Sequence, residues 1–161
     1  MGMTVEFYSA DPPQLITLFA TENNSDVTFF EQLKTYPVAD FSFHLWIPDD
    51  LDSLCQAVSK QSSLKSLVFR NLLVKQLWYD GEAESLALLS EHFALTLASL
   101  KENEIERAAL DWTATFPYQE PPQQTPAYRA LWKLQEVARD AVAQKKSLIF
   151  HLVGNPSFFR W

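Results

Sequence analysis

The sequence predicts an α+β fold in which one helix-rich domain, residues 1–161, packs on a small β-sheet. The first observation is the alternation of apolar and polar side chains over residues 4–9, which is typical of a strand with one solvent-facing side. The second is the run 148–153, which is apolar on both sides and is therefore typical of an interior strand. The third is the helical spacing of apolar residues between them. We therefore expect a sheet that contains an N-terminal strand at about 4–9 and a C-terminal strand at about 148–153.

Three helices are expected in the first third of the chain. Asp11 followed by Pro12 favours a helix start directly after the first strand. A second, short helix should contain Phe29 and end before Pro37, because the residue before a proline disfavours helical backbone. The three carboxylates within residues 49–52 favour the start of a third helix, where the backbone dipole attracts negative charge.

Residues 38–47 lie between the second and third of these helices, and periodicity leaves two structures open for them. Their apolar side chains alternate with polar ones, as in a strand. Phe41 and Leu45 are also one helical turn apart, with Asp40 before them as a cap. Pro48 ends the segment in either case.

In the middle of the chain, two long helices are expected. Residues 64–78 are apolar nearly all round, which is typical of a central helix contacted from several sides, and residues 82–100 should form another helix. Ser99 and Glu102 resemble a capping box for the helix after that. The proline-rich stretch 116–125 should be a long loop.

The last helix and strand have the clearest signals in the chain. Thr125 and Pro126 favour the helix start, and Lys145 and Lys146 favour its end. The apolar run that follows predicts the middle of the sheet. His151 lies within this run, and we expect a core histidine with one of its nitrogens hydrogen-bonded.

The formal net charge is −7, and all of the excess negative charge lies in about the first third of the sequence. Residues 1–63 hold two lysines against nine acidic residues, whereas residues 64–161 hold equal numbers of basic and acidic side chains. Nucleic acid and anionic membrane surfaces would be repelled by that acidic third. We therefore expect neither as a partner, and the acidic surface either keeps the protein soluble or docks a basic protein.

Several kinds of functional site are disfavoured by composition. With only three glycines, the chain lacks the loops that cradle nucleotide phosphates, and with Cys55 alone it has no disulfide and no multi-thiolate metal site. We expect no cofactor and no metal, because the three histidines are far apart and the acids of residues 49–52 are explained by the helix start. Cys55 lies on the inward stripe of its helix, where a thiol is inert. The N-terminus lacks the features of a secretory signal, no stretch is long enough to span a bilayer, and we expect a cytoplasmic protein.

Surface aromatic residues are the best functional signal. Tyr118 lies in the proline-stiffened loop, and the last five residues include three aromatic rings and an arginine, Phe158, Phe159, Arg160 and Trp161. These residue types dominate the energy of protein interfaces. The competing interpretation is that the loop and the last five residues pack back onto the body of the protein.

The order of these features resembles the YfbM-like family of uncharacterised bacterial proteins. The resemblance rests on the start Met1-Gly2-Met3 before a strand and an acid-started helix, the stretch 100–105, the Phe116-Pro117 loop, and the final helix and strand. His44 and Trp46 resemble an aromatic and histidine pair that the family places on a helix, which favours a helix for residues 41–47. The resemblance implies an α+β fold and a cytoplasmic protein, and it implies no activity.

Two functional hypotheses follow. The favoured one is a non-catalytic protein-interaction module, including a homodimer, that binds through the aromatic residues named above and through His44 and Trp46. The alternative is a small enzyme with an acid/base pocket in which His44 acts with Asp40. A polar pocket around His44 would distinguish the second hypothesis from the first.

Overall fold

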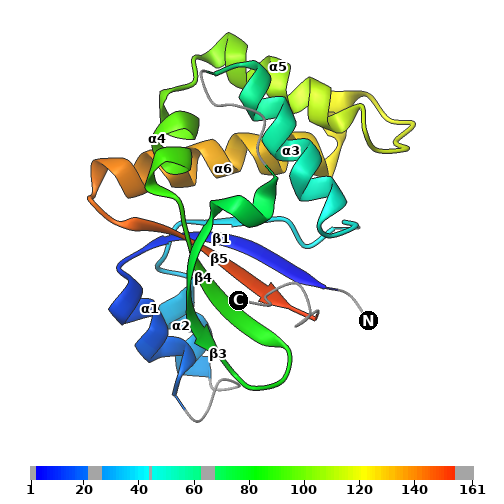
Figure 1. Ribbon diagram of the computed structural model, residues 1–161. Helices are drawn as coiled ribbons and strands as arrows, with labels where there is room; N and C mark the ends of the chain where they lie inside the picture. Colours follow the sequence, from blue (N-terminus) through cyan, green and yellow to red (C-terminus); the bar gives the residue numbers. More distant parts are fainter. Residues whose placement is uncertain (1–2, 22–26, 44, 63–67, 155–161) are drawn as a thin grey trace.

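The computed structural model describes residues 3–21, 27–43, 45–62 and 68–154, and these form an α+β fold (Figure 1). The strands are β1 (Thr4–Ala10), β2 (Val38–Asp40), β3 (Leu73–Tyr79), β4 (Glu84–Leu89) and β5 (Ser147–Val153). The helices are α1 (Pro12–Phe19), α2 (Val27–Leu33), α3 (Asp49–Lys60), α4 (Glu91–Ser99), α5 (Glu102–Thr113) and α6 (Pro126–Ala143). Two short 3-10 helices, Phe69–Leu72 and Pro122–Gln124, complete the elements of this part of the chain.

The five strands form one antiparallel sheet in the order β2-β1-β5-β4-β3. β5 is therefore the middle strand, as its apolar run predicts. It pairs with β1 along its whole length, from Thr4 opposite Val153 to Ala10 opposite Ser147. The two ends of the sequence are thus joined at the centre of the sheet.

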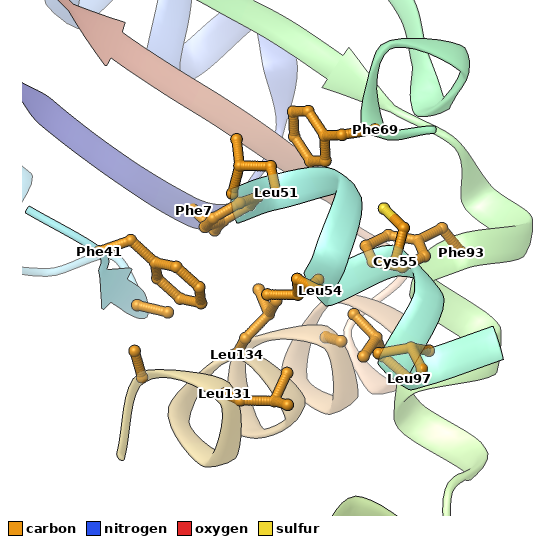
Figure 2. Packing of buried hydrophobic residues seen from close by; sticks show 14 of the residues in the cluster. Phe7, Phe41, Leu51, Leu54, Cys55, Phe69, Phe93, Leu97, Leu131 and Leu134 are labelled. Atoms are coloured by element: carbon orange, nitrogen blue, oxygen red, sulfur yellow. The ribbon is translucent and has the colours of Figure 1, made fainter. Parts of the chain in front are cut away.

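Helices cover both faces of the sheet (Figure 1). On one face, α1 and α2 pack over a small cluster that includes Tyr8, Leu86 and Ile149. On the other face, α3, α4, α5 and α6 enclose the main core, in which Phe7 and other strand residues meet the helices (Figure 2). Every strand of the interior is thus buried on both sides, which explains why β5 has no polar face. None of the helices in the described ranges has both the length and the apolar character that crossing a membrane requires.

The predicted positions of several elements are confirmed. β1 and β5 lie where the alternation and the apolar run placed them, and α1, α2, α3 and α6 begin and end close to the expected residues. Thr125 accepts a hydrogen bond from the Tyr128 N–H at the start of α6, and Pro126 is its first residue. The stretch 116–125 is a loop, apart from one short 3-10 turn.

Of the two predicted helices in the middle of the chain, the first is wrong in its described part, and the second is right only for its later half, which forms α4. Within 64–78, the described part forms the 3-10 helix Phe69–Leu72 and β3, and within 82–100, residues Glu84–Leu89 form β4. A short apolar run is compatible with a buried strand as well as with a helix, and periodicity alone cannot separate them. The boundary between β4 and α4 is at a polar residue, Ser90, whose Oγ accepts the Phe93 N–H and so caps α4.

Residues 38–47 form neither of the two predicted structures over their full length. Only Val38–Asp40 is a strand, and the Phe41 N–H continues its pairing by bonding the Val5 carbonyl at 2.7 Å. The helix favoured by the family resemblance does not form in the described residues of this segment. The chain leaves the sheet here because the Ser42 N–H turns to the Asp40 carboxylate at 2.8 Å.

The predicted capping box is also misplaced. α5 starts at Glu102, two residues later than a cap at Ser99 would place it, and the carboxylate that reaches back belongs to Glu104, whose Oε1 accepts the Lys101 N–H at 2.8 Å. On α6, the buried Gln135 donates through Nε2 to the Leu97 carbonyl at 3.1 Å and the Leu100 carbonyl at 2.8 Å. Arg139, also on α6, donates to the Ala98 and Leu100 carbonyls at 3.1 Å each, and the Leu100 N–H bonds the Leu97 carbonyl at 3.4 Å. The end of α4 is therefore satisfied largely by side chains from another helix.

We expect Gln135→Leu to lower the free energy of unfolding by about 1 kcal/mol, because the carbonyl groups of Leu97 and Leu100 at the end of α4 each lose one of their donors. The measurement is urea-induced unfolding followed by circular dichroism. Gln56→Leu is the matched control, since Gln56 is exposed on α3 and its replacement should change stability by less than about 0.5 kcal/mol. Equal stability of the two variants would show that Gln135 does not hold the end of α4.

Candidate functional site

A row of aromatic rings runs from the core to the surface between α3 and α5. Phe43 packs on Phe41, with ring centroids 6.0 Å apart, and Phe116 packs on Phe43 at 6.1 Å. Tyr118 stacks on Phe116 at 5.4 Å with an interplanar angle of 22°. The proline-rich loop after α5 is therefore tied to the segment after β2, although the two are far apart in the sequence.

Trp46 lies in the segment that leads from the sheet into α3, and its side chain is 80% exposed. Its backbone is held in place, because the Trp46 N–H donates to Asp50 Oδ2 at 2.6 Å and the Trp46 carbonyl accepts the Asp50 N–H at 2.8 Å. Asp50 is in turn fixed to α5 by Trp112, whose Nε1 donates to the Asp50 carbonyl at 2.9 Å. A large apolar ring is thus displayed to solvent from a well-ordered backbone.

Tyr118 is close enough to Asp50 to sense its charge. Partial burial raises the pKa of the Tyr118 hydroxyl, and the carboxylates of Asp50 and Glu120 raise it further. The two segments that meet here, residues 41–52 and 116–125, contain no lysine and no arginine. We call this surface the aromatic–acidic face, and its residues are Phe43, Trp46, Phe116 and Tyr118 with Asp49, Asp50 and Glu120.

The structure thus places two of the residues that the sequence singled out, Trp46 and Tyr118, near the same residue, Asp50. The other predicted binding residues, His44, Phe158, Phe159, Arg160 and Trp161, lie outside the described residues. Asp40, the proposed partner of His44 in an acid/base pair, is exposed at the end of β2 and accepts the Ser42 N–H. The acid/base hypothesis for His44 and Asp40 therefore stays a prediction.

The sheet holds a second group of polar side chains, which sequence reasoning missed. His151, on β5, is 5% exposed, and its Nδ1 lies 2.8 Å from Glu6 Oε2 on β1. Its Nε2 lies 2.8 Å from Glu84 Oε1 on β4. The Tyr8 hydroxyl donates to the same Glu6 oxygen at 2.6 Å. The expectation of one satisfied nitrogen is wrong, because both nitrogens are hydrogen-bonded.

This arrangement favours the protonated form of His151. A carboxylate can only accept, so two carboxylate partners require both ring nitrogens to donate. Burial disfavours the imidazolium, but the hydrogen bonds and negative charges of Glu6 and Glu84 outweigh burial and raise the pKa of His151. Burial likewise disfavours the Glu6 carboxylate, and hydrogen bonds from His151 and Tyr8 outweigh it, so the pKa of Glu6 is lowered.

The geometry of the His151 group fits a structural role better than a chemical one. Neither ring nitrogen is left for a substrate, and the ring of Phe19 from α1 lies 4.8 Å from the imidazole ring. Glu6 is directly opposite His151 in the strand register, whereas Glu84 is opposite Val153 and reaches His151 diagonally. The sequence predicted that Glu6 lies on a strand with one solvent-facing side. It placed Glu84 in a helix, so the meeting of Glu84 with His151 could not be predicted.

Cys55 and the acidic residues offer no further site in the described part of the chain. Cys55 is buried among core residues (Figure 2), and burial raises the pKa of its thiol to about 12, so the reactive thiolate is strongly disfavoured. In the described ranges, no group of three or more histidine, cysteine, aspartate and glutamate side chains is arranged to hold a metal ion.

The His151 group predicts a characteristic pH dependence of stability. The raised pKa means that the contribution of His151 is fully present below its ordinary value of 6.5 and is lost as the pH rises through the folded-state pKa. The lowered pKa of Glu6 means that its contribution is present above its ordinary value of 4.5 and is lost as the pH falls through the folded-state pKa. We therefore expect the free energy of unfolding to fall on both sides of the window between these values.

The measurement is urea unfolding at pH 5.5, 7 and 8.5 for the wild-type protein and for His151→Gln. We expect the variant to be about 3 kcal/mol less stable at pH 5.5, because two partly buried carboxylates lose their cation. The difference between the proteins should shrink as the pH rises. A difference that stays constant with pH would contradict the assignment of a protonated His151.

The two groups differ in what they leave available to a partner. No family model, curated protein or solved structure matches this chain. A role must therefore be inferred from the residues themselves. The His151 group is saturated by its own hydrogen bonds, whereas the aromatic–acidic face presents an exposed ring beside carboxylates, and it is the better candidate for a binding site.

Proposed function

We propose that this protein is a non-catalytic interaction module that binds a basic protein segment through the aromatic–acidic face. The observation that carries the proposal is Trp46, a tryptophan that is 80% exposed yet has its backbone fixed by two hydrogen bonds to Asp50. Tryptophan is enriched among the residues that dominate binding energy, and a fixed backbone lowers the entropy lost on binding.

The charge of the face selects the chemistry of the partner. The charges of Asp50 and Glu120 act on Tyr118, Asp49 is the neighbour of Asp50 in the sequence, and the segments that form the face carry no lysine or arginine of their own. A lysine or arginine side chain can pair with these carboxylates and lie over the face of Trp46 or Tyr118 at the same time. Apolar residues beside that cation would cover the remaining ring surface.

The same charge disfavours twofold self-association through this face. In a symmetric dimer the same patch meets itself, so the three carboxylates would face three others. A homodimer, if it forms, would use another surface. The acidic face also supports the expectation that nucleic acid is not a partner. The cytoplasmic location and the likeness to the YfbM-like family stay predictions.

The test is a selection of random twelve-residue peptides displayed on phage against the immobilised wild-type protein, with counter-selection on Trp46→Ala. We expect the enriched peptides to combine lysine or arginine with apolar residues. Fluorescence anisotropy of one such peptide should give a Kd that is raised roughly tenfold by Trp46→Ala, because a central tryptophan is a typical hot spot.

Val27→Ala is the matched control, because Val27 is 69% exposed on α2, on the opposite side of the sheet. The control should bind the peptide as the wild-type protein does, and higher salt should weaken binding to both. Enrichment of acidic peptides, no enrichment at all, or binding that is indifferent to Trp46→Ala would each overturn the proposal.

A further inference from the structure

A groove lies at the other end of α6 from the aromatic–acidic face. It has a volume of about 560 Å³ and is bounded by α4, by the turn from α6 into β5, and by the adjoining parts of β3 and β4. Three apolar side chains around it are unusually exposed: Val74 at 60%, Leu95 at 44% and Val142 at 39%. Buried leucines, among them Leu89 and Leu148, form its floor.

The charges at the rim are unequal. Lys145 and Lys146 line the groove at the end of α6, and Glu91 lines it at the start of α4. Two ammonium groups against one carboxylate leave a positive rim on a protein whose formal net charge is −7. An apolar groove with a cationic rim complements a ligand with an apolar body and a negative end.

Lys145 has a backbone conformation that favours another residue. Its φ of 54° places it in the left-handed region, at the point where the Lys146 N–H bonds the Ala141 carbonyl at 2.8 Å and the Lys145 N–H bonds the Val142 carbonyl at 3.3 Å. Glycine is the usual residue at this position of a helix end. The lysine at this position therefore costs backbone strain, but it places at the rim of the groove an amine that glycine would not supply.

The size of the groove argues for a small ligand. Its volume falls in the range of about 300–1,000 Å³ that is typical of small-molecule sites. A helix from a partner protein is about 10 Å across with its side chains, and even two turns of it would occupy more than about 800 Å³. A single alkyl chain can lie along the leucines and reach the lysines with one end.

We propose that this groove binds a free single-chain amphiphile with a carboxylate head group, with Lys145 and Lys146 at the head and Leu95 and Val142 along the chain. This proposal does not depend on the aromatic–acidic face. A membrane surface is a different source of the same chemistry, and the volume favours one chain over the two chains of a phospholipid.

The test is isothermal titration of the full chain with dodecanoate below its micelle-forming concentration. We expect saturable binding of one dodecanoate per protein. Dodecyltrimethylammonium, which has the same chain and a positive head, should bind at least tenfold more weakly, and phosphatidylglycerol vesicles should not retain the protein on sedimentation. Equal binding of both amphiphiles, or no saturable binding, would overturn the proposal.

Variants separate the roles of the chain and the head. Leu95→Asp should abolish measurable binding, because it places a carboxylate in the apolar groove. Lys145→Asn combined with Lys146→Gln should weaken dodecanoate binding roughly fivefold, as expected for partly exposed ion pairs, and asparagine tolerates the left-handed backbone. Lys34→Gln is the matched control, because it removes one exposed amine elsewhere and should leave binding unchanged.

Other occupants of the groove give different results. If a second copy fills it, sedimentation velocity of the wild-type protein will show a dimer that Leu95→Asp dissociates. If residues 155–161 fill it, their deletion will strengthen dodecanoate binding several-fold. Either result would overturn the proposal, whereas a monomer whose dodecanoate affinity is unchanged by the deletion supports it.

Discussion

The hydrogen-bonded charge of His151 between Glu6 and Glu84 holds together the three central strands of the sheet. Each ring nitrogen is 2.8 Å from a carboxylate on a different neighbouring strand. Because the imidazole ring is almost fully buried, losing either partner would leave one ring N–H without an acceptor in a low-dielectric interior. A shift of β1 or β4 by one residue would turn its glutamate to the opposite face, so we infer that the group fixes the register of both strands.

This arrangement also explains why the largest polar cluster of the sheet is not the binding site. Its charges are used internally, and Phe19 from α1 lies against the imidazole ring. The surfaces that remain available lie at the two ends of α6, which at 18 residues is about 27 Å long. The aromatic–acidic face lies near its start and the lysine-rimmed groove lies at its end. Their opposite charges suit them to different kinds of ligand.

Part of the candidate site could be read from the sequence. Tyr118 was identifiable as an aromatic residue in a proline-stiffened loop, and Trp46 only through the resemblance to a family that pairs it with a histidine. That both of them are close to Asp50 was not identifiable, because Asp50 had an adequate local explanation at the start of α3. The partners of His151 were hidden for a similar reason: they are 145 and 67 residues away, and one of them lies on a strand that the sequence suggested was a helix.

The sequence by itself determined the α+β class, the central place of β5, and the helices with a clear apolar stripe, such as α3 and α6. These features depend on local periodicity and on capping residues, which act within one or two turns of chain. Only the tertiary structure decided that Leu73–Tyr79 and Glu84–Leu89 are strands, because a short apolar run takes whichever form its neighbours can pair with and cover. It also decided which polar side chains meet, since that depends on strand register between the two ends of the chain.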